Sequence, residues 1–153
     1  MNGLSHWDGI KHFSADSLVD NWGDPHNVER ALLEELDRFR IFLNAPIIVT
    51  SCFRPSTTGN EGGSQHAHGL AADIVVPTFK GTILDLFFAA SRFNFKGIGI
   101  YRDWEYGGKK TGGLHVDMRH APHRALWFCY KDTQEVQRYV ALSQETLHGF
   151  GLL

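Results

Sequence analysis

The stretch from Ser64 to Asp73, Ser-Gln-His-Ala-His-Gly-Leu-Ala-Ala-Asp, gathers side chains that can do chemistry. It fits the pattern S-x-H-x-x-G-x-A-x-D at all five fixed positions. If each fixed residue has a background frequency of a few per cent, chance gives such a match on the order of once in a million positions. A second short motif, Leu114-His115-Val116-Asp117, follows farther along the chain. Zinc takes imidazole nitrogens and carboxylate oxygens as ligands, so the two motifs indicate a metal site.

Both motifs resemble those of the zinc D-Ala-D-Ala carboxypeptidase family (peptidase family M15), whose fold is shared by the hedgehog signalling domain. In that family the first His and the Asp of the pattern, and the His of the later motif, bind the metal. The resemblance implies that His66, Asp73 and His115 bind Zn²⁺ in a zinc metallopeptidase. It extends over residues 13–119 and thins out after about Trp127.

The physical reading of these residues agrees with the resemblance. His66 closes a loop and Asp73 lies inside the next expected strand, so a turn through Gly69 can bring both side chains to one point. Glycine permits the backbone conformation that such a turn requires. A lone histidine near a loop is usually solvent-exposed or held by a local hydrogen bond, but two histidines and an aspartate together favour a metal site with one tetrahedral position left for water.

Arg54 ends the segment Thr50-Ser51-Cys52-Phe53-Arg54, which is similar to the family's T-S-G-Y-R segment. Cys52 and Phe53 depart from the usual Gly and Tyr. The resemblance implies that Arg54 faces the substrate, where a guanidinium can hold a carboxylate or stabilise an oxyanion. The alternative is a weak surface ion pair.

Two further residues of the loop are candidate substrate contacts. Ser64 is expected to donate a hydrogen bond to substrate or to a metal ligand, and its alternative is an ordinary turn residue. His68 is not a ligand in the family, but it lies close enough to the metal loop to contact substrate. Its alternative is a polar surface residue.

The general base is the point where the family pattern fails. The implied mechanism is hydrolysis in which zinc lowers the pKa of its water toward ~7 and a carboxylate relays the proton. Many family members carry that acid three residues before the third ligand, where this chain has Gly112. Asp103 and Glu105 lie in the same loop, and of these two we favour Glu105 as the base. The alternative for Glu105 is a solvated loop carboxylate. Asp117, the other candidate, shares a strand face with His115 and is expected first to orient that imidazole.

A set of helices and strands must position these residues. After the Pro25-His26-Asn27 turn, a helix is expected with its apolar stripe at Val28, Leu32, Leu36, Phe39 and Leu43. We expect strands at 46–50, 70–76, 97–101, 114–118 and 126–130, further helices at 14–18, 82–93 and 133–147, and long loops at 52–64 and 102–113. The predicted fold is α+β, a small, mostly antiparallel sheet flanked by helices, in a single zinc peptidase domain over 1–153. The resemblance implies the hedgehog/D,D-peptidase fold.

Composition and charge argue against several classes of protein, including nucleic-acid-binding and membrane-spanning proteins. The net charge is −2 and the only adjacent basic pair of note is Lys109-Lys110, so we expect no nucleic-acid partner. No run approaches the roughly 18 apolar residues of a membrane span. Met1 to Lys11 lacks the features of a secretory signal. Cys52 and Cys129 are too few for a disulfide framework and are read as free, partly buried thiols.

The expected function is therefore hydrolysis of peptide bonds in bacterial peptidoglycan, with the stem peptide as substrate and a monomeric enzyme. A D,D-carboxypeptidase and a phage endolysin-type endopeptidase both fit. We expect the protein to be cytoplasmic until released, or virion-associated and active on the periplasmic cell wall. The alternatives are a non-catalytic, hedgehog-like zinc domain, which the missing acid at Gly112 keeps open, and a cytoplasmic D,D-dipeptidase.

Overall fold

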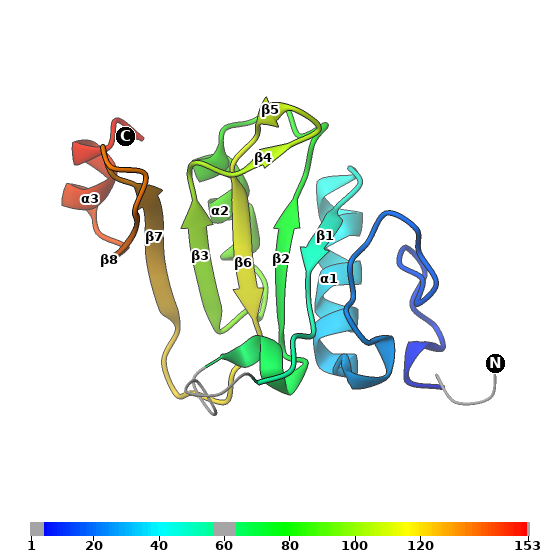
Figure 1. Cartoon of the computed structure of the whole chain (residues 1–153). Helices are drawn as coiled ribbons and strands as arrows, with labels where there is room; N and C mark the ends of the chain where they lie inside the picture. Colours follow the sequence, from blue (N-terminus) through cyan, green and yellow to red (C-terminus); the bar gives the residue numbers. More distant parts are fainter. Residues whose placement is uncertain (1–4, 57–63, 153) are drawn as a thin grey trace.

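The computed structural model describes residues 5–56 and 64–152. Its centre is a six-stranded sheet in the order β1-β2-β6-β3-β7-β8, with α1 and α2 packed against one face (Figure 1). The sheet strands are β1 (Ile48–Ser51), β2 (Ala71–Val75), β3 (Gly97–Tyr101), β6 (Gly113–Asp117), β7 (Ala125–Lys131) and β8 (Gln137–Ala141). A separate hairpin consists of β4 (Glu105–Tyr106) and β5 (Lys109–Lys110). The helices are η1 (Ser5–Trp7), η2 (Pro25–Asn27), α1 (Arg30–Leu43), η3 (Gln65–His68), α2 (Ile83–Ala90) and α3 (Gln144–Gly149).

Strand pairing confirms the α+β prediction. Every neighbouring pair in the sheet is antiparallel except β3 and β7, which run parallel. The central strands β2, β6 and β3 pair in register, with Asp73 opposite His115 and His115 opposite Gly99. The two motifs found in the sequence therefore lie on adjacent strands.

The helix-covered face of the sheet forms the hydrophobic core. Side chains alternate between the two faces of a strand, and one set of alternate residues points toward the helices. The members of this set that are fully buried are Val49, Ala72, Ile74, Ile98, Ile100, Leu114, Val116 and Phe128. The other set includes Asp73, His115, Tyr101 and Trp127, and we call the face that carries it the open face.

The helix expected after the Pro25 turn is α1. Leu32, Leu36 and Phe39 of its apolar stripe are fully buried, so the 3.6-residue periodicity identified the buried side correctly. The helix ends at Asn44, whose left-handed backbone (φ 48°) allows its N–H to donate to the carbonyls of Arg40 and Ile41. This helix lies behind β1 and contributes Leu32, Leu33, Leu36 and Phe39 to the core (Figure 1).

The prediction of a single helix over 133–147 was wrong. The chain instead forms β8, which pairs antiparallel with β7, and then the short helix α3. Asp132 Oδ1 accepts hydrogen bonds from the backbone N–H groups of Gln134 and Val136, and Glu135 adopts a positive φ of 60°. These contacts fix a tight turn, so hairpin pairing with the preceding strand β7 overrides the local helical preference of a Gln- and Glu-containing segment.

Three other expectations also need correction or restriction. No helix forms over residues 14–18, because Ser17 Oγ accepts the backbone N–H of Asp20 and the segment turns instead. Within the long loop predicted over 52–64, residues 57–63 lie outside the described part of the chain. The loop predicted over 102–113 contains the β4–β5 hairpin. Within the described ranges, no helix combines the length and the apolar character needed to cross a membrane.

Candidate metal centre

One row of residues across the sheet organises the open face. Asp73 of β2 pairs with His115 of β6, His115 pairs with Gly99 of β3, and Gly99 pairs with Trp127 of β7. Residues two positions away along each strand share this face, so the neighbouring rows also face the site. On one side lie Gly113, Tyr101, Cys129 and Tyr139, and on the other Ala71, Asp117, Gly97 and Ala125.

Glycines in β3 make room for the larger side chains beside them. A Cβ at Gly97 would lie 2.1 Å from Oδ2 of Asp117, and a Cβ at Gly99 would lie 2.4 Å from the indole of Trp127. Any other residue at either position would displace its neighbour. The Trp127 ring therefore lies across Gly99 and reaches His115, with 5.0 Å between the ring centroids.

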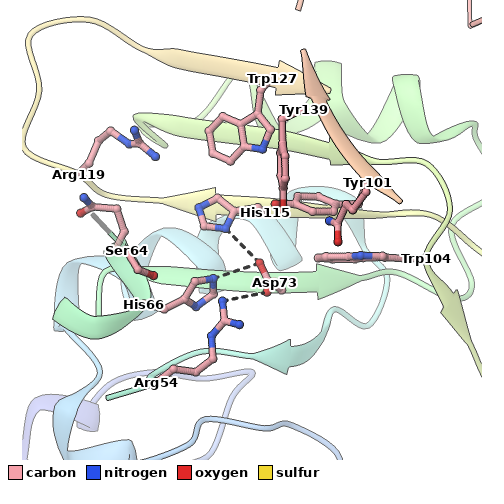
Figure 2. A pocket seen from close by; sticks show the side chains of 12 residues that line it. Arg54, Ser64, His66, Asp73, Tyr101, Trp104, His115, Arg119, Trp127 and Tyr139 are labelled. Atoms are coloured by element: carbon pink, nitrogen blue, oxygen red, sulfur yellow. Dashed lines mark hydrogen bonds and ion pairs between the residues drawn. The ribbon is translucent and has the colours of Figure 1, made fainter. Parts of the chain in front are cut away.

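His66, Asp73 and His115 form the centre of the open face (Figure 2). One ligand atom from each residue lies within 4.8 Å of the other two. Nε2 of His66 is 3.3 Å and Nδ1 of His115 is 3.0 Å from Oδ1 of Asp73. His66 and His115 are buried, and the side chain of Asp73 is only 13% exposed, which is uncommon for charged or polar residues. The structure thus brings together the ligand set that the sequence motifs imply.

His66 reaches this point through the turn that the sequence analysis expected. The residue lies on η3, and Gly69 ends this short helix with a positive φ of 68°. A Cβ at Gly69 would lie 1.7 Å from the carbonyl oxygen of Asn27, so both the backbone conformation and the space require glycine. The chain then enters β2, which carries Asp73.

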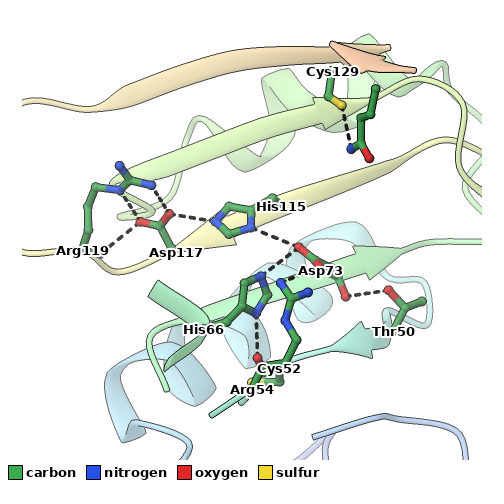
Figure 3. Close-up of polar contacts among 10 residues, drawn as sticks. Thr50, Cys52, Arg54, His66, Asp73, His115, Asp117, Arg119 and Cys129 are labelled. Atoms are coloured by element: carbon green, nitrogen blue, oxygen red, sulfur yellow. Dashed lines mark hydrogen bonds and ion pairs between the residues drawn. The ribbon is translucent and has the colours of Figure 1, made fainter. Parts of the chain in front are cut away.

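Both imidazole rings are oriented by a second hydrogen bond (Figure 3). Nδ1 of His66 lies 2.6 Å from the carbonyl oxygen of Cys52, so it carries the proton and leaves the Nε2 lone pair facing Asp73. Nε2 of His115 lies 2.8 Å from Oδ2 of Asp117, which leaves Nδ1 as the free nitrogen. Metal-binding histidines are held in this way, with the other ring nitrogen bonded to a carbonyl or a carboxylate.

Asp117 is itself fixed by Arg119. The Asp117 side chain is fully buried, and its Oδ1 accepts from Nε of Arg119 at 2.8 Å while its Oδ2 accepts from Nη2 at 2.6 Å. Burial raises the pKa of Asp117, but the hydrogen bonds from Arg119 and His115 outweigh it and hold the pKa well below its usual range. The carboxylate stays ionised, and both of its oxygens already accept hydrogen bonds. Its geometry is that of a group that orients His115.

The electrostatics of the centre favour a bound cation. Burial raises the pKa of Asp73, but the imidazoles of His115 and His66, which donate to this carboxylate when they are protonated, lower it to about 2. Burial lowers the pKa of His115, whereas Asp117 and Asp73 raise it above its ordinary value. Arg119 neutralises Asp117, whereas Asp73 remains an ionised carboxylate beside two imidazoles, as a metal ligand must be.

Comparison with known proteins identifies the family. The Peptidase M15 family profile matches residues 11–106, well over half of the chain. The chain belongs to the peptidase M15 family. M15 peptidases are metallopeptidases and generally depend on zinc, and the hedgehog/D,D-peptidase fold expected from the motifs is the fold of this family. Searches of curated proteins and of solved structures each found no match.

The matched segment includes two of the three metal-binding candidates of this M15 peptidase, His66 and Asp73. His115 lies beyond residue 106, so its place in the site rests on strand pairing and on the distances to Asp73. The donor set of two imidazoles and one carboxylate agrees with the chemistry of zinc.

The other predicted site residues divide into two groups. Arg54 and Ser64 line the cavity of about 560 Å³ that contains the metal centre, and Nη2 of Arg54 lies 3.8 Å from Oδ2 of Asp73. His68 is exposed and lines a neighbouring cavity instead. Glu105 is exposed on β4 opposite Lys110 and does not line the cavity of the M15 site. The structure therefore does not support our choice of Glu105 as the base.

Several residues that line the cavity were missed by the sequence analysis: Tyr101, Trp104, Trp127, Gln137 and Tyr139. Alternation along the strand that contains His115 and along its neighbours is the signal that identifies Tyr101 and Trp127 once the pairing is known. Gln137 and Tyr139 were hidden by the helix wrongly predicted over 133–147. The residues missed form one wall of the site.

Proposed function

We propose that this M15 peptidase is a zinc-dependent hydrolase of peptidoglycan stem peptides, acting as a D,D-carboxypeptidase or as an endolysin-type endopeptidase. The observation that carries the proposal is the convergence of His66, Asp73 and His115 in one cavity with Arg54 at its rim. The resemblance of the two motifs to D-Ala-D-Ala carboxypeptidases supports the wall peptide as substrate.

The three residues would hold zinc through Nε2 of His66, Oδ1 of Asp73 and Nδ1 of His115. Three protein ligands are the number found in catalytic zinc sites, since structural sites use four. When bound, zinc supplies a Lewis acid for the scissile carbonyl and lowers the pKa of a coordinated water toward ~7. The Cys52 carbonyl and the Asp117 carboxylate keep the two imidazoles in the required tautomers.

Arg54 is the residue proposed to bind the substrate's carboxylate. Its side chain is 58% exposed and its guanidinium has N–H groups available beyond the single 3.8 Å approach to Asp73. A guanidinium binds a carboxylate through two parallel hydrogen bonds, which fixes both position and orientation. Stem peptides end in a carboxylate, so this contact would place the terminal residue beside the metal centre. Ser64, on the same side of the cavity, is the proposed hydrogen-bond donor to the peptide backbone.

A second candidate function is a non-catalytic, hedgehog-like metal domain. Among residues 5–56 and 64–152, Asp73 is the only carboxylate that lines the cavity, and Asp73 belongs to the ligand set. A hydrolase of this type uses a proton relay near the metal, so this observation favours a binding role over catalysis. The two functions differ in whether peptide bonds are cut.

The test is incubation of the zinc-loaded protein with purified sacculi, followed by mass spectrometry of the released fragments. We expect fragments whose ends define one scissile bond, and no release by the His66→Ala protein. A protein that retains zinc and folds normally but releases nothing would support the second candidate.

A further inference from the structure

Two tyrosines face the metal centre from the side opposite to Arg54. Arg54 follows β1 at one edge of the sheet, whereas Tyr101 lies on β3 and Tyr139 on β8 at the other edge. The strands between them carry Asp73 and His115. All five residues line the same cavity, and Figure 2 shows the hydroxyl ends of the two tyrosines directed into it toward His115.

Strand pairing and packing hold both phenols in place. Tyr101 pairs with Cys129, which pairs with Tyr139, so the two tyrosines occupy one row across β3, β7 and β8. Their ring centroids are 6.3 Å apart with the planes nearly perpendicular. Trp104 stacks on Tyr101 at 4.2 Å, and Gly113 leaves room for this indole, since a Cβ there would lie 2.2 Å from it. Rings fixed in this way lose little freedom when a ligand binds.

The chemistry of a phenol limits what these residues can do. A tyrosine hydroxyl is neutral at pH 7 and can donate one hydrogen bond. It therefore suits an oxygen that carries partial negative charge, whereas the charged Arg54 suits a full carboxylate. During amide hydrolysis the scissile carbonyl oxygen becomes more negative, and donors aimed at it lower the barrier.

The other polar groups on this side of the cavity are already engaged. Nε2 of Gln137 donates to Sγ of Cys129 at 2.9 Å. Trp127 lies across Gly99 against His115, and Arg119 is paired with the buried Asp117. The two phenol hydroxyls interact with each other and with Trp127 and Cys129, and both open into the cavity, where each can donate to a ligand oxygen.

We propose that Tyr101 and Tyr139 are catalytic residues that donate hydrogen bonds to the scissile carbonyl oxygen of the bound peptide. The proposal rests on the proposed peptidase function and adds an orientation for its substrate. The terminal carboxylate lies toward β1 and Arg54, and the scissile carbonyl oxygen points toward β3 and β8. Tyr101 lies within the segment matched by the family profile, and Tyr139 lies on a strand beyond it.

The test compares Tyr101→Phe, Tyr139→Phe and the double variant with Tyr130→Phe. Tyr130 lies on β7 but packs on Phe128, on the helix-covered face, so its hydroxyl is a matched control. We expect all four proteins to keep about one zinc per chain, because no ligand is changed. With sacculus-derived peptides, kcat of the double variant should fall ~100-fold while KM changes little, and Tyr130→Phe should match the wild type.

Calorimetric titration of the zinc-loaded proteins with inorganic phosphate gives a readout that needs no turnover. Phosphate presents tetrahedral anionic oxygens, so the double variant should bind it about tenfold more weakly than wild type and Tyr130→Phe. Unchanged phosphate affinity together with unchanged kcat in the double variant would overturn the proposal. If the wild type cuts no wall peptide, the proposed function fails, and the phosphate titration alone then decides whether the phenols bind oxygen.

Discussion

The two faces of the central sheet are built from the same strands but follow different rules. On the helix-covered face, Leu114 and Val116 are fully buried among other apolar side chains. On the open face, the residues between and beside them, His115 and Asp117, are almost as deeply buried but polar. Burial on the first face stabilises the fold, since each large apolar side chain removed from water contributes roughly 1.5–3 kcal/mol.

Burial of the polar side chains on the open face opposes folding, because it removes them from water. A buried carboxylate or imidazole costs free energy unless it is paired, and here every one is paired with another polar group of the site. Among the described residues no buried side-chain N or O atom lacks a hydrogen-bond partner. The comparison teaches that one face specifies the structure and the other specifies the chemistry. Substitutions on the two faces should therefore affect different measurements.

The largest effect is expected from a ligand on the open face. His66→Ala should remove one of three metal-binding atoms, so zinc should fall from about one per chain to near none, with hydrolysis below detection. Elemental analysis after dialysis measures the zinc. A full equivalent of zinc in this variant would remove His66 from the ligand set.

On the helix-covered face the effect should appear in stability alone. Leu114→Ala removes a fully buried side chain beside His115, and the unfolding free energy should fall by ~2–5 kcal/mol. Denaturant titration measures this change. The folded fraction should still bind zinc with wild-type stoichiometry, and a loss of zinc larger than the loss of folded protein would mean that the two faces are not independent.

The buried residues of the helix-covered face were predicted well, because the spacing of apolar residues within one segment is enough to identify them. The periodicity of α1 and the apolar runs of β2 and β3 reveal buried positions without knowledge of partners. The metal candidates were also readable, since His66 and Asp73 lie within one motif. The strand pairing of the C-terminal part could not be predicted from the sequence. Tyr139 reaches the site only because β8 pairs with β7, and the segment around it has the composition of a helix.

Asp117→Asn should weaken zinc binding without removing it. The amide cannot hold the Nε2–H of His115 as a charged acceptor does, so zinc affinity should fall ~10–100-fold. Competition with a chromophoric chelator measures the affinity. Asp85→Asn is the matched control, because Asp85 caps α2 on the helix-covered side and should leave zinc affinity unchanged. Equal affinities in wild type and Asp117→Asn would show that the hydrogen bond does not support the ligand.

The pH dependence of zinc binding should reflect the same contact. The pKa of His115 is lowered by burial but raised further by Asp117 and Asp73, so the proton stays on the imidazole to a higher pH than usual. Zinc must displace that proton. Below the pKa of His115, affinity should therefore fall by up to about tenfold per pH unit, and above it the affinity should level off. Chelator competition across pH 5 to 9 tests this, and an affinity that rises on acidification would contradict it.

The smallest effect is expected at Glu105, the base favoured from sequence. Because Glu105 is exposed on β4 and outside the cavity, Glu105→Gln should change kcat by less than about twofold, where loss of a true relay costs ~100-fold or more. Wall-peptide kinetics measure the change. A dead variant that keeps its zinc would restore Glu105 as the relay and would require the β4–β5 hairpin to move over the site.

The hydrogen-bond acceptors that orient the two imidazoles differ in how much they restrict the sequence. The ring of His66 is held by the main-chain carbonyl of Cys52, and every amino acid supplies that carbonyl. The usual glycine of the family can therefore be replaced by cysteine at this position while the tautomer is preserved. The ring of His115 depends on the Asp117 side chain, and Gly97 must stay small to leave that carboxylate its space. The His66 side of the centre accepts different residues at position 52, whereas the His115 side requires particular residues on both β6 and β3.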